Sequence, residues 1–194
     1  MGMLVLGLIV FLGVHSVRIF AEDWRTRGIA RWGEMGWKGL YSALSLIGFA
    51  LIVWGFAQAR LQPVVLWSPP AMLKHLNSLF TLAAFILVAA AYVPRNRIRA
   101  RLHHPMILGV KLWAFGHLLA TGTLADVVLF GAFLLWAVLD FRAARRRDRA
   151  LGTVYAPGTM GPTAIAVLVG VVAWAVFAFW LHAAWIGVAP FPRA

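Results

Sequence analysis

Two histidines lie deep within apolar stretches of the sequence, where an ionisable side chain needs a specific reason. His15 falls in the stretch 1–21, and His117 falls in the stretch 105–121. Titratable residues in such positions commonly mark functional sites. Two neutral imidazoles on different helices are a sufficient set of axial ligands for a haem held between them. The alternative is that each histidine hydrogen-bonds to a neighbouring hydroxyl or carbonyl group, and the spacing alone does not decide between the two.

Lys111 shares its apolar stretch with His117, but the two side chains are predicted to contact different neighbours. Six residues separate the two, so on a helix their side chains point about 120° apart. An ammonium at this depth must extend to the surface, pair with an acid or contact an anionic ligand. A haem propionate is one such ligand, and a nearby acid such as Asp140 is the alternative.

A basic group precedes the same stretch at its helix start. His103 and His104 stand directly before Pro105, with Arg99 and Arg101 close by in the sequence. Proline suits the first helical turn, and a helix N-terminus favours negative charge. His104 and Arg101 are therefore candidate contacts for an anion, a phosphate or a cofactor. A basic membrane anchor is the alternative explanation.

The elements that would position these residues are membrane-spanning helices. The chain has 194 residues, of which 62% are hydrophobic and 12% are charged, and its mean hydropathy of +0.84 is too high for an ordinary soluble domain. Six apolar stretches are long enough, or nearly long enough, to cross a hydrocarbon core of about 30 Å as helices. They are residues 1–21, 38–59, 72–93, 105–121, 124–141 and 162–188. The sequence predicts an all-α polytopic membrane bundle of about six transmembrane helices, forming one domain over residues 1–194.

The formal charge of +12 is concentrated in three of the predicted loops. Arginines and one lysine gather between the first and second stretches, between the third and fourth, and between the fifth and sixth. By the positive-inside rule these loops are cytoplasmic, and both termini are predicted to be periplasmic. The pattern indicates contact with a lipid bilayer and gives no reason to expect nucleic-acid binding.

Other kinds of site find little support in the sequence. Because cysteine is absent, disulfides, iron–sulfur clusters and thiolate ligands are excluded, and histidine is the obvious strong metal ligand. His75 and His182, near the ends of their stretches, form a reserve pair of ligands. All six acids lie near the ends of the predicted spans, and no Ser-His-Asp set or carboxylate pair emerges, so hydrolytic chemistry is not expected.

Two segments of the chain resemble a known family. The run HPMILGVKLWAFGHLLATG, residues 104–122, resembles the signature of NnrU proteins, and FLGVHSVRIF, residues 11–20, resembles the family's N-terminal histidine segment. The resemblance covers nearly the whole chain. It implies a multi-pass protein of the bacterial inner (cytoplasmic) membrane that is linked to denitrification, specifically to nitrite and nitric oxide reduction.

The same segments are similar to those of zeta-carotene isomerase, a membrane enzyme of this family that uses b-type haem to isomerise a carotenoid double bond. The similarity implies that His15, in VHS, and His117, in WAFGHLL, are haem ligands. A cysteine that the isomerase carries three residues before the later histidine is Ala114 here, which counts against the isomerase mechanism. The His-Pro start also resembles isoprenylcysteine-type methyltransferases, but their paired C-terminal glutamates are missing, so methyl transfer ranks low.

These observations together predict a protein that binds b-type haem through His15 and His117, with Lys111 or the inner arginines near the propionates. Its expected role is redox or haem-linked and associated with denitrification. One alternative is a haem-dependent isomerase acting on an apolar polyene. Another is a non-catalytic assembly factor for a nitric oxide or nitrite reductase. Whether the protein is an enzyme stays open.

Overall fold

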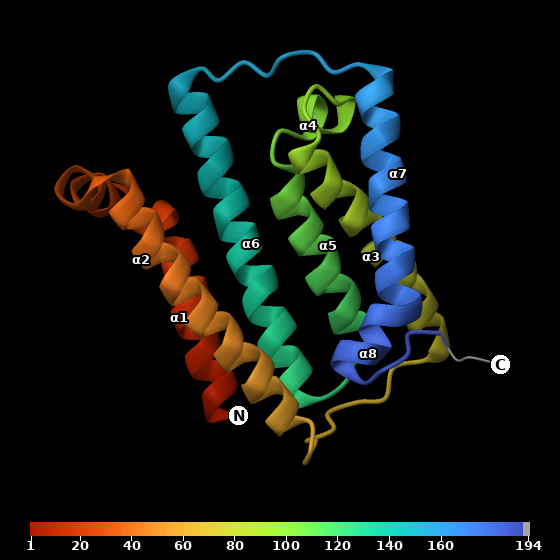
Figure 1. Cartoon of the computed structure of the whole chain (residues 1–194). Coiled ribbons are helices and arrows are strands. Elements are labelled where there is room, and N and C mark those ends of the chain that lie inside the picture. Colours follow the sequence, from red (N-terminus) through yellow and green to blue (C-terminus); the bar gives the residue numbers. More distant parts are fainter. Residues whose placement is uncertain (192–194) are drawn as a thin grey trace. The chain divides into compact units, whose positions relative to one another are not determined.

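The computed structural model describes residues 1–191, and this part of the chain is helical with no strands, as predicted (Figure 1). The helices are α1 (Gly2–Phe20), α2 (Glu22–Ala59), α3 (Ala71–Tyr92), α4 (Arg97–Leu102), α5 (Pro105–Ala120), α6 (Leu124–Leu151), α7 (Met160–Val176) and α8 (His182–Ile186). A π-helical segment, Phe177–Leu181, joins α7 to α8. The prediction of an all-α fold is confirmed.

Five helical segments of the described chain are long and apolar enough to cross a membrane: α1, α2, α3, α6 and the continuous stretch Met160–Ile186. The sixth predicted span, α5, is apolar but has only 16 residues. At 1.5 Å per residue it is about 24 Å long, somewhat less than a typical hydrocarbon core. The chain is therefore a multi-pass membrane protein, and the periplasmic position of its termini stays a prediction.

Two of the segments that connect the predicted spans are helical in the structure. The polar segment after α1 is the first part of α2, which kinks at Gly33, where φ is 73° and ψ is 164°. Glycine adopts this left-handed φ without a steric penalty. The basic loop around residues 95–101 contains the short helix α4, because the Asn96 side chain accepts a hydrogen bond from the Arg99 amide and so caps its start.

The chain divides into two compact units. Unit 1 comprises Met1–Ser68 and Gly122–Ala143, and unit 2 comprises Pro69–Thr121 and Ala144–Ala194. Helix α6 therefore belongs to unit 1 over most of its length and to unit 2 at its charged end. His15 lies in unit 1, whereas His104, Lys111 and His117 lie in unit 2.

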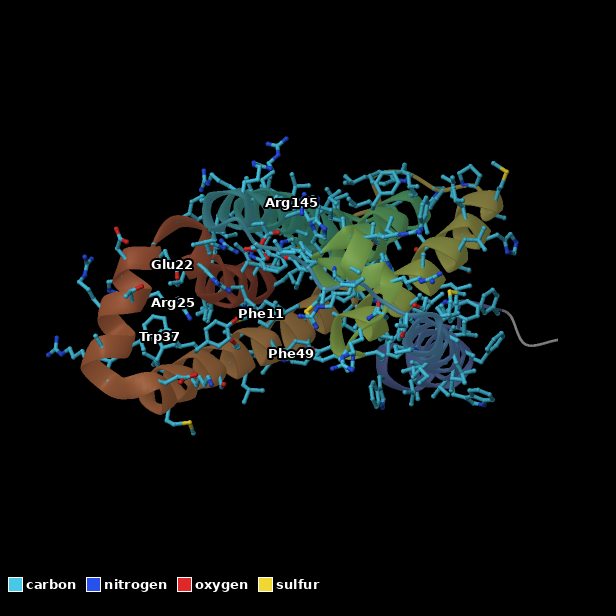
Figure 2. All side chains as sticks on the ribbon, turned by 90° about the horizontal axis from the view of Figure 1, so that it is seen from above. Phe11, Glu22, Arg25, Trp37, Phe49 and Arg145 are labelled. Carbon is cyan, nitrogen blue, oxygen red and sulfur yellow. The ribbon has the colours of Figure 1, made fainter. Side chains whose placement is uncertain are left out.

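Unit 1 depends on a close approach of α1 to α2. A Cβ atom added to Gly48 would lie 2.7 Å from the backbone nitrogen of Phe11, and one added to Gly55 would lie 2.2 Å from that of Leu4. The rings of Phe11 and Phe49, both labelled in Figure 2, pack with centroids 6.4 Å apart. Small residues of this kind allow helices to pack where lipid removes the hydrophobic driving force.

In unit 2, α3 packs against both α5 and α7. A Cβ atom at Gly109 of α5 would lie 2.9 Å from the carbonyl oxygen of Ala84, and one at Gly170 of α7 would lie 2.5 Å from the Cα of Ile86. Both glycines allow the neighbouring backbones to approach closely. The three helices form the frame that carries the polar residues at the α5 start.

Asn96 fixes the polar end of this frame. It is only 1% exposed, and its Nδ2 group donates to the carbonyl oxygens of Ala90 at 2.7 Å and Val93 at 2.5 Å. Its Oδ1 atom accepts from the Arg99 amide at 2.7 Å. All the hydrogen-bonding positions of the amide except one acceptor site are thus used to join the end of α3 to α4.

Asn96→Ala should lower the free energy of unfolding by about 2 kcal/mol, because it leaves buried backbone groups without their partners. The measurement is reversible unfolding of the purified full chain in detergent. Ser78→Ala is the control, since the Ser78 hydroxyl makes a single exposed bond to the Lys74 carbonyl oxygen. Equal stability of the two variants would contradict the structural role given to Asn96.

Candidate functional site

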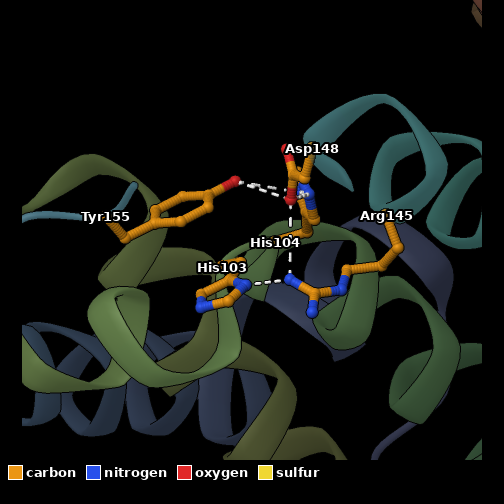
Figure 3. Close-up of polar contacts among 5 residues, drawn as sticks. All are labelled: His103, His104, Arg145, Asp148 and Tyr155. Carbon is orange, nitrogen blue, oxygen red and sulfur yellow. Dashed lines mark hydrogen bonds and ion pairs between the residues drawn. The ribbon is translucent and has the colours of Figure 1, made fainter. Parts of the chain in front are cut away.

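A polar cluster of five side chains surrounds the start of α5 in unit 2 (Figure 3). Nε2 of His104 lies 2.8 Å from Oδ2 of Asp148, and the Tyr155 hydroxyl donates to the same oxygen at 3.0 Å. Arg145 forms an ion pair with Asp148 at 3.5 Å and hydrogen-bonds to Nδ1 of His103. The His103 ring stacks on Tyr155 with centroids 4.1 Å apart. One carboxylate therefore organises the whole cluster.

Local sequence features bring these side chains together. Arg145 and Asp148 are three residues apart, so they share one face of α6. His104 is the N-cap residue of α5, and Pro105 takes the first helical position. His103 has a positive φ of 67°, which turns the chain sharply between α4 and α5. Gly152, with φ of 60°, ends α6 and returns the chain toward Tyr155.

The charges in the cluster are settled by its hydrogen bonds. Asp148 lies beyond the apolar stretch 124–141, and its side chain is 15% exposed. Burial alone raises the pKa of Asp148, but the hydrogen bonds from His104 and Tyr155 outweigh it and bring the pKa below the usual range. Burial and the adjacent carboxylate both raise the pKa of Tyr155. At neutral pH the cluster thus holds an aspartate and a neutral phenol.

Asp148→Asn should lower the free energy of unfolding by about 1–2 kcal/mol at neutral pH, because three donors lose an ionised acceptor. Since the folded-state pKa of Asp148 is lowered, its contribution is present above the unfolded pKa of about 4 and is lost as pH falls through the folded value. Unfolding of both proteins as a function of pH measures this difference. Convergence of the two curves at acid pH is expected, and parallel curves would contradict it.

His15, the first predicted haem ligand, lies in an aromatic environment in unit 1. Its Nδ1 atom is 2.7 Å from the carbonyl oxygen of Phe11, and its ring stacks on the Phe11 ring at 4.2 Å. Tyr41 and Trp136 contact other sides of the imidazole, at 5.2 and 6.0 Å between centroids. Because a carbonyl oxygen only accepts, Nδ1 carries the proton, and in the neutral imidazole Nε2 carries the lone pair.

His117, the second predicted ligand, has the same local arrangement in unit 2. Its Nδ1 atom lies 2.8 Å from the carbonyl oxygen of Trp113, four residues earlier on α5. The same reasoning assigns the proton to Nδ1 and the lone pair to Nε2. Lys111 lies on the same helix and is half-buried. Arg101 is exposed at the end of α4, and the structure brings His104, but not Lys111 or His117, into the Asp148 cluster.

Each of the two histidines has a buried polar atom near it that finds no hydrogen-bond partner among residues 1–191. One is Nε1 of Trp136, whose ring stands edge-on to His15. The other is Oδ1 of Asn77, which lies 2.4 Å from the position of a Cβ on Gly116, the residue before His117. Buried polar atoms of folded proteins nearly always have partners, so these two atoms are exceptions to the usual pairing.

Sequence reasoning missed the residues that complete the cluster. Asp148 stands in the basic run FRAARRRDRALG between the fifth and sixth predicted spans, and Tyr155 stands in the Gly- and Pro-rich segment that follows it. One signal was available. Asp148 is the only acidic residue in the sequence of unit 2, so it is the only side-chain carboxylate within the unit for the many cations there.

Of three comparisons with known proteins, one gives a match. No curated protein and no solved structure matches the chain significantly. The model of the family described as NnrU protein matches residues 3–190, nearly the whole length and both compact units. The chain therefore belongs to the NnrU family.

Proposed function

We propose that this NnrU family membrane protein binds b-type haem through His15 and His117 and has a redox or haem-linked role associated with denitrification. The observation that carries the proposal is the shared tautomer of the two histidines. Each donates from Nδ1 to the carbonyl oxygen four residues before it. Histidines that ligate metals typically donate the other ring nitrogen in this way, which fixes the ring and directs the lone pair of Nε2 to the metal.

The surroundings of the histidines fit the proposed group. The aromatic side chains around His15 suit an apolar macrocycle, and the unpartnered Trp136 indole can donate to a carboxylate such as a propionate. Lys111 is the candidate cation for a propionate in unit 2. A haem with two histidine ligands supplies one-electron redox chemistry.

Carotenoid isomerisation is the second candidate, but the chain offers less for it. That chemistry requires an iron site that changes its ligands. The position of the isomerase cysteine is Ala114, which is fully buried on α5 and has no ligand atom. Two permanent histidine ligands favour electron transfer, because a substrate can reach iron only if one histidine leaves. A non-catalytic assembly factor for a nitric oxide or nitrite reductase would need no haem.

Absorption spectra of the detergent-purified protein test the proposal. Oxidised and dithionite-reduced samples should show the sharp bands of a six-coordinate b-type haem, and a pyridine haemochrome assay should give about one haem per chain. A colourless protein that also fails to take up added haem would overturn the proposal. Co-purification of such a colourless protein with a reductase subunit would support the assembly factor instead.

A further inference from the structure

A depression of about 440 Å³ lies at the polar end of unit 2. Its walls are formed by α4 and by the loop between α6 and α7: Arg97, Ala100, Arg101, Tyr155, Pro157 and Gly158. Arg97 and Arg101 are four residues apart, so they lie on the same face of α4. The depression therefore presents two guanidinium groups from one helix to the same space.

These guanidinium groups have no acidic partner in the described part of the chain. Neither Arg97 nor Arg101 takes part in an ion pair there. Asp148, the only acid in the sequence of unit 2, is occupied by His104, Tyr155 and Arg145. The depression is therefore positively charged, and the sequence of the unit has no second Asp or Glu side chain to neutralise it.

The walls of the depression are fixed by short backbone contacts. A Cβ added to Gly158 would lie 2.3 Å from the Arg97 backbone nitrogen, so the loop rests directly on the start of α4. The Thr159 amide donates to the Arg95 carbonyl oxygen at 2.8 Å, and the Arg97 amide donates to the Thr163 hydroxyl at 2.9 Å. Because these amides are already paired, a bound anion would interact with the guanidinium groups.

The depression also lies where the apolar helices of unit 2 end. Helix α3 ends at Tyr92, α5 begins at Pro105 and α7 begins at Met160, all at the end where α4 lies (Figure 1). In a bilayer this end is near the headgroups, where anionic phosphate is concentrated. Paired guanidinium groups match the oxygen geometry of phosphate better than any other side chain.

We propose that Arg97 and Arg101 bind a phosphate group in this depression, from either an anionic phospholipid headgroup or a soluble phosphate compound. The haem proposed above plays no part in this site. Tyr155 forms part of the wall of the depression, and its hydrogen bond to Asp148 fixes its position there.

The test is calorimetric titration of the full chain in neutral detergent at 0.15 M salt with three probes. These are short-chain phosphatidylglycerol, short-chain phosphatidylcholine and inorganic phosphate. The double variant R97Q/R101Q removes both exposed guanidinium groups, and its fold is checked by circular dichroism. The matched control R146Q/R149Q removes the same charge from exposed positions of α6 that do not line the depression.

The R97Q/R101Q variant should bind the preferred probe about thirtyfold more weakly, because each arginine near a phosphate surface contributes about a factor of five. The control should stay within about threefold of the original protein. Preference for phosphatidylglycerol over both other probes would identify a lipid headgroup, and binding of inorganic phosphate with equal strength would identify a soluble compound. Equal losses in both double variants, or no binding of any probe, would overturn the proposal.

Discussion

Replacing His15 or His117 by alanine should abolish or reshape the haem spectrum of the purified protein. Each substitution removes one axial ligand and leaves iron with at most one histidine, so the six-coordinate low-spin bands should disappear. Added imidazole should restore them in part, because it can enter the space left by the side chain. The measurement is the reduced-minus-oxidised absorption spectrum of each variant at matched protein concentration.

The reserve pair provides the control for this experiment. His182 is half-buried, and its Nδ1 atom hydrogen-bonds to the Val188 carbonyl oxygen, whereas His75 is exposed near the start of α3. His75→Ala and His182→Ala should retain the original spectrum. Unchanged spectra in both His15→Ala and His117→Ala would exclude these residues as ligands. The two histidines would then be hydrogen-bonding residues of their own helices, as the bonds to Phe11 and Trp113 already allow.

Much of the fold could be predicted because lipid imposes a simple rule on sequence. A segment that crosses hydrocarbon must be long, apolar and helical, so hydropathy alone located the spans that the structure contains. The depth of His15 and His117 in those spans singled them out as candidates by the same rule. The hydrogen bonds to carbonyl oxygens were not predictable as such, because either ring nitrogen of a histidine can donate.

The polar cluster could not be predicted because it joins residues far apart in the chain without any periodic pattern. His104 meets Asp148 across 44 residues and Tyr155 across 51. These contacts depend on the positive φ of His103 and on the turn of the chain at Gly152. Neither backbone feature produces a pattern in the hydropathy of the sequence. Asn96 was equally hidden, since a lone asparagine in a basic segment gives no sign that it will be almost fully buried.

Substituting the interface glycines of unit 1 should have the largest effect on stability. Gly48→Ala and Gly55→Ala each place a Cβ less than 3 Å from backbone atoms of α1, so the helices must move apart. A loss of about 3 kcal/mol is expected for each, near the upper end for overpacking in a core. Gly13→Ala is the control, because no neighbouring atom lies within 4 Å of a Cβ there. Unfolding in detergent measures all three variants.

The two damaging variants should differ in their effect on haem, because they press on different parts of α1. A Cβ at Gly48 displaces the backbone of Phe11, whose carbonyl oxygen holds Nδ1 of His15. A Cβ at Gly55 acts on Leu4, about three turns away from His15 along the helix. At a temperature where both variants stay folded, Gly48→Ala should therefore alter the haem spectrum more than Gly55→Ala. Equal spectra would mean that the Phe11 carbonyl does not orient the ligand, while a lower stability of both would still support the close packing of α1 on α2.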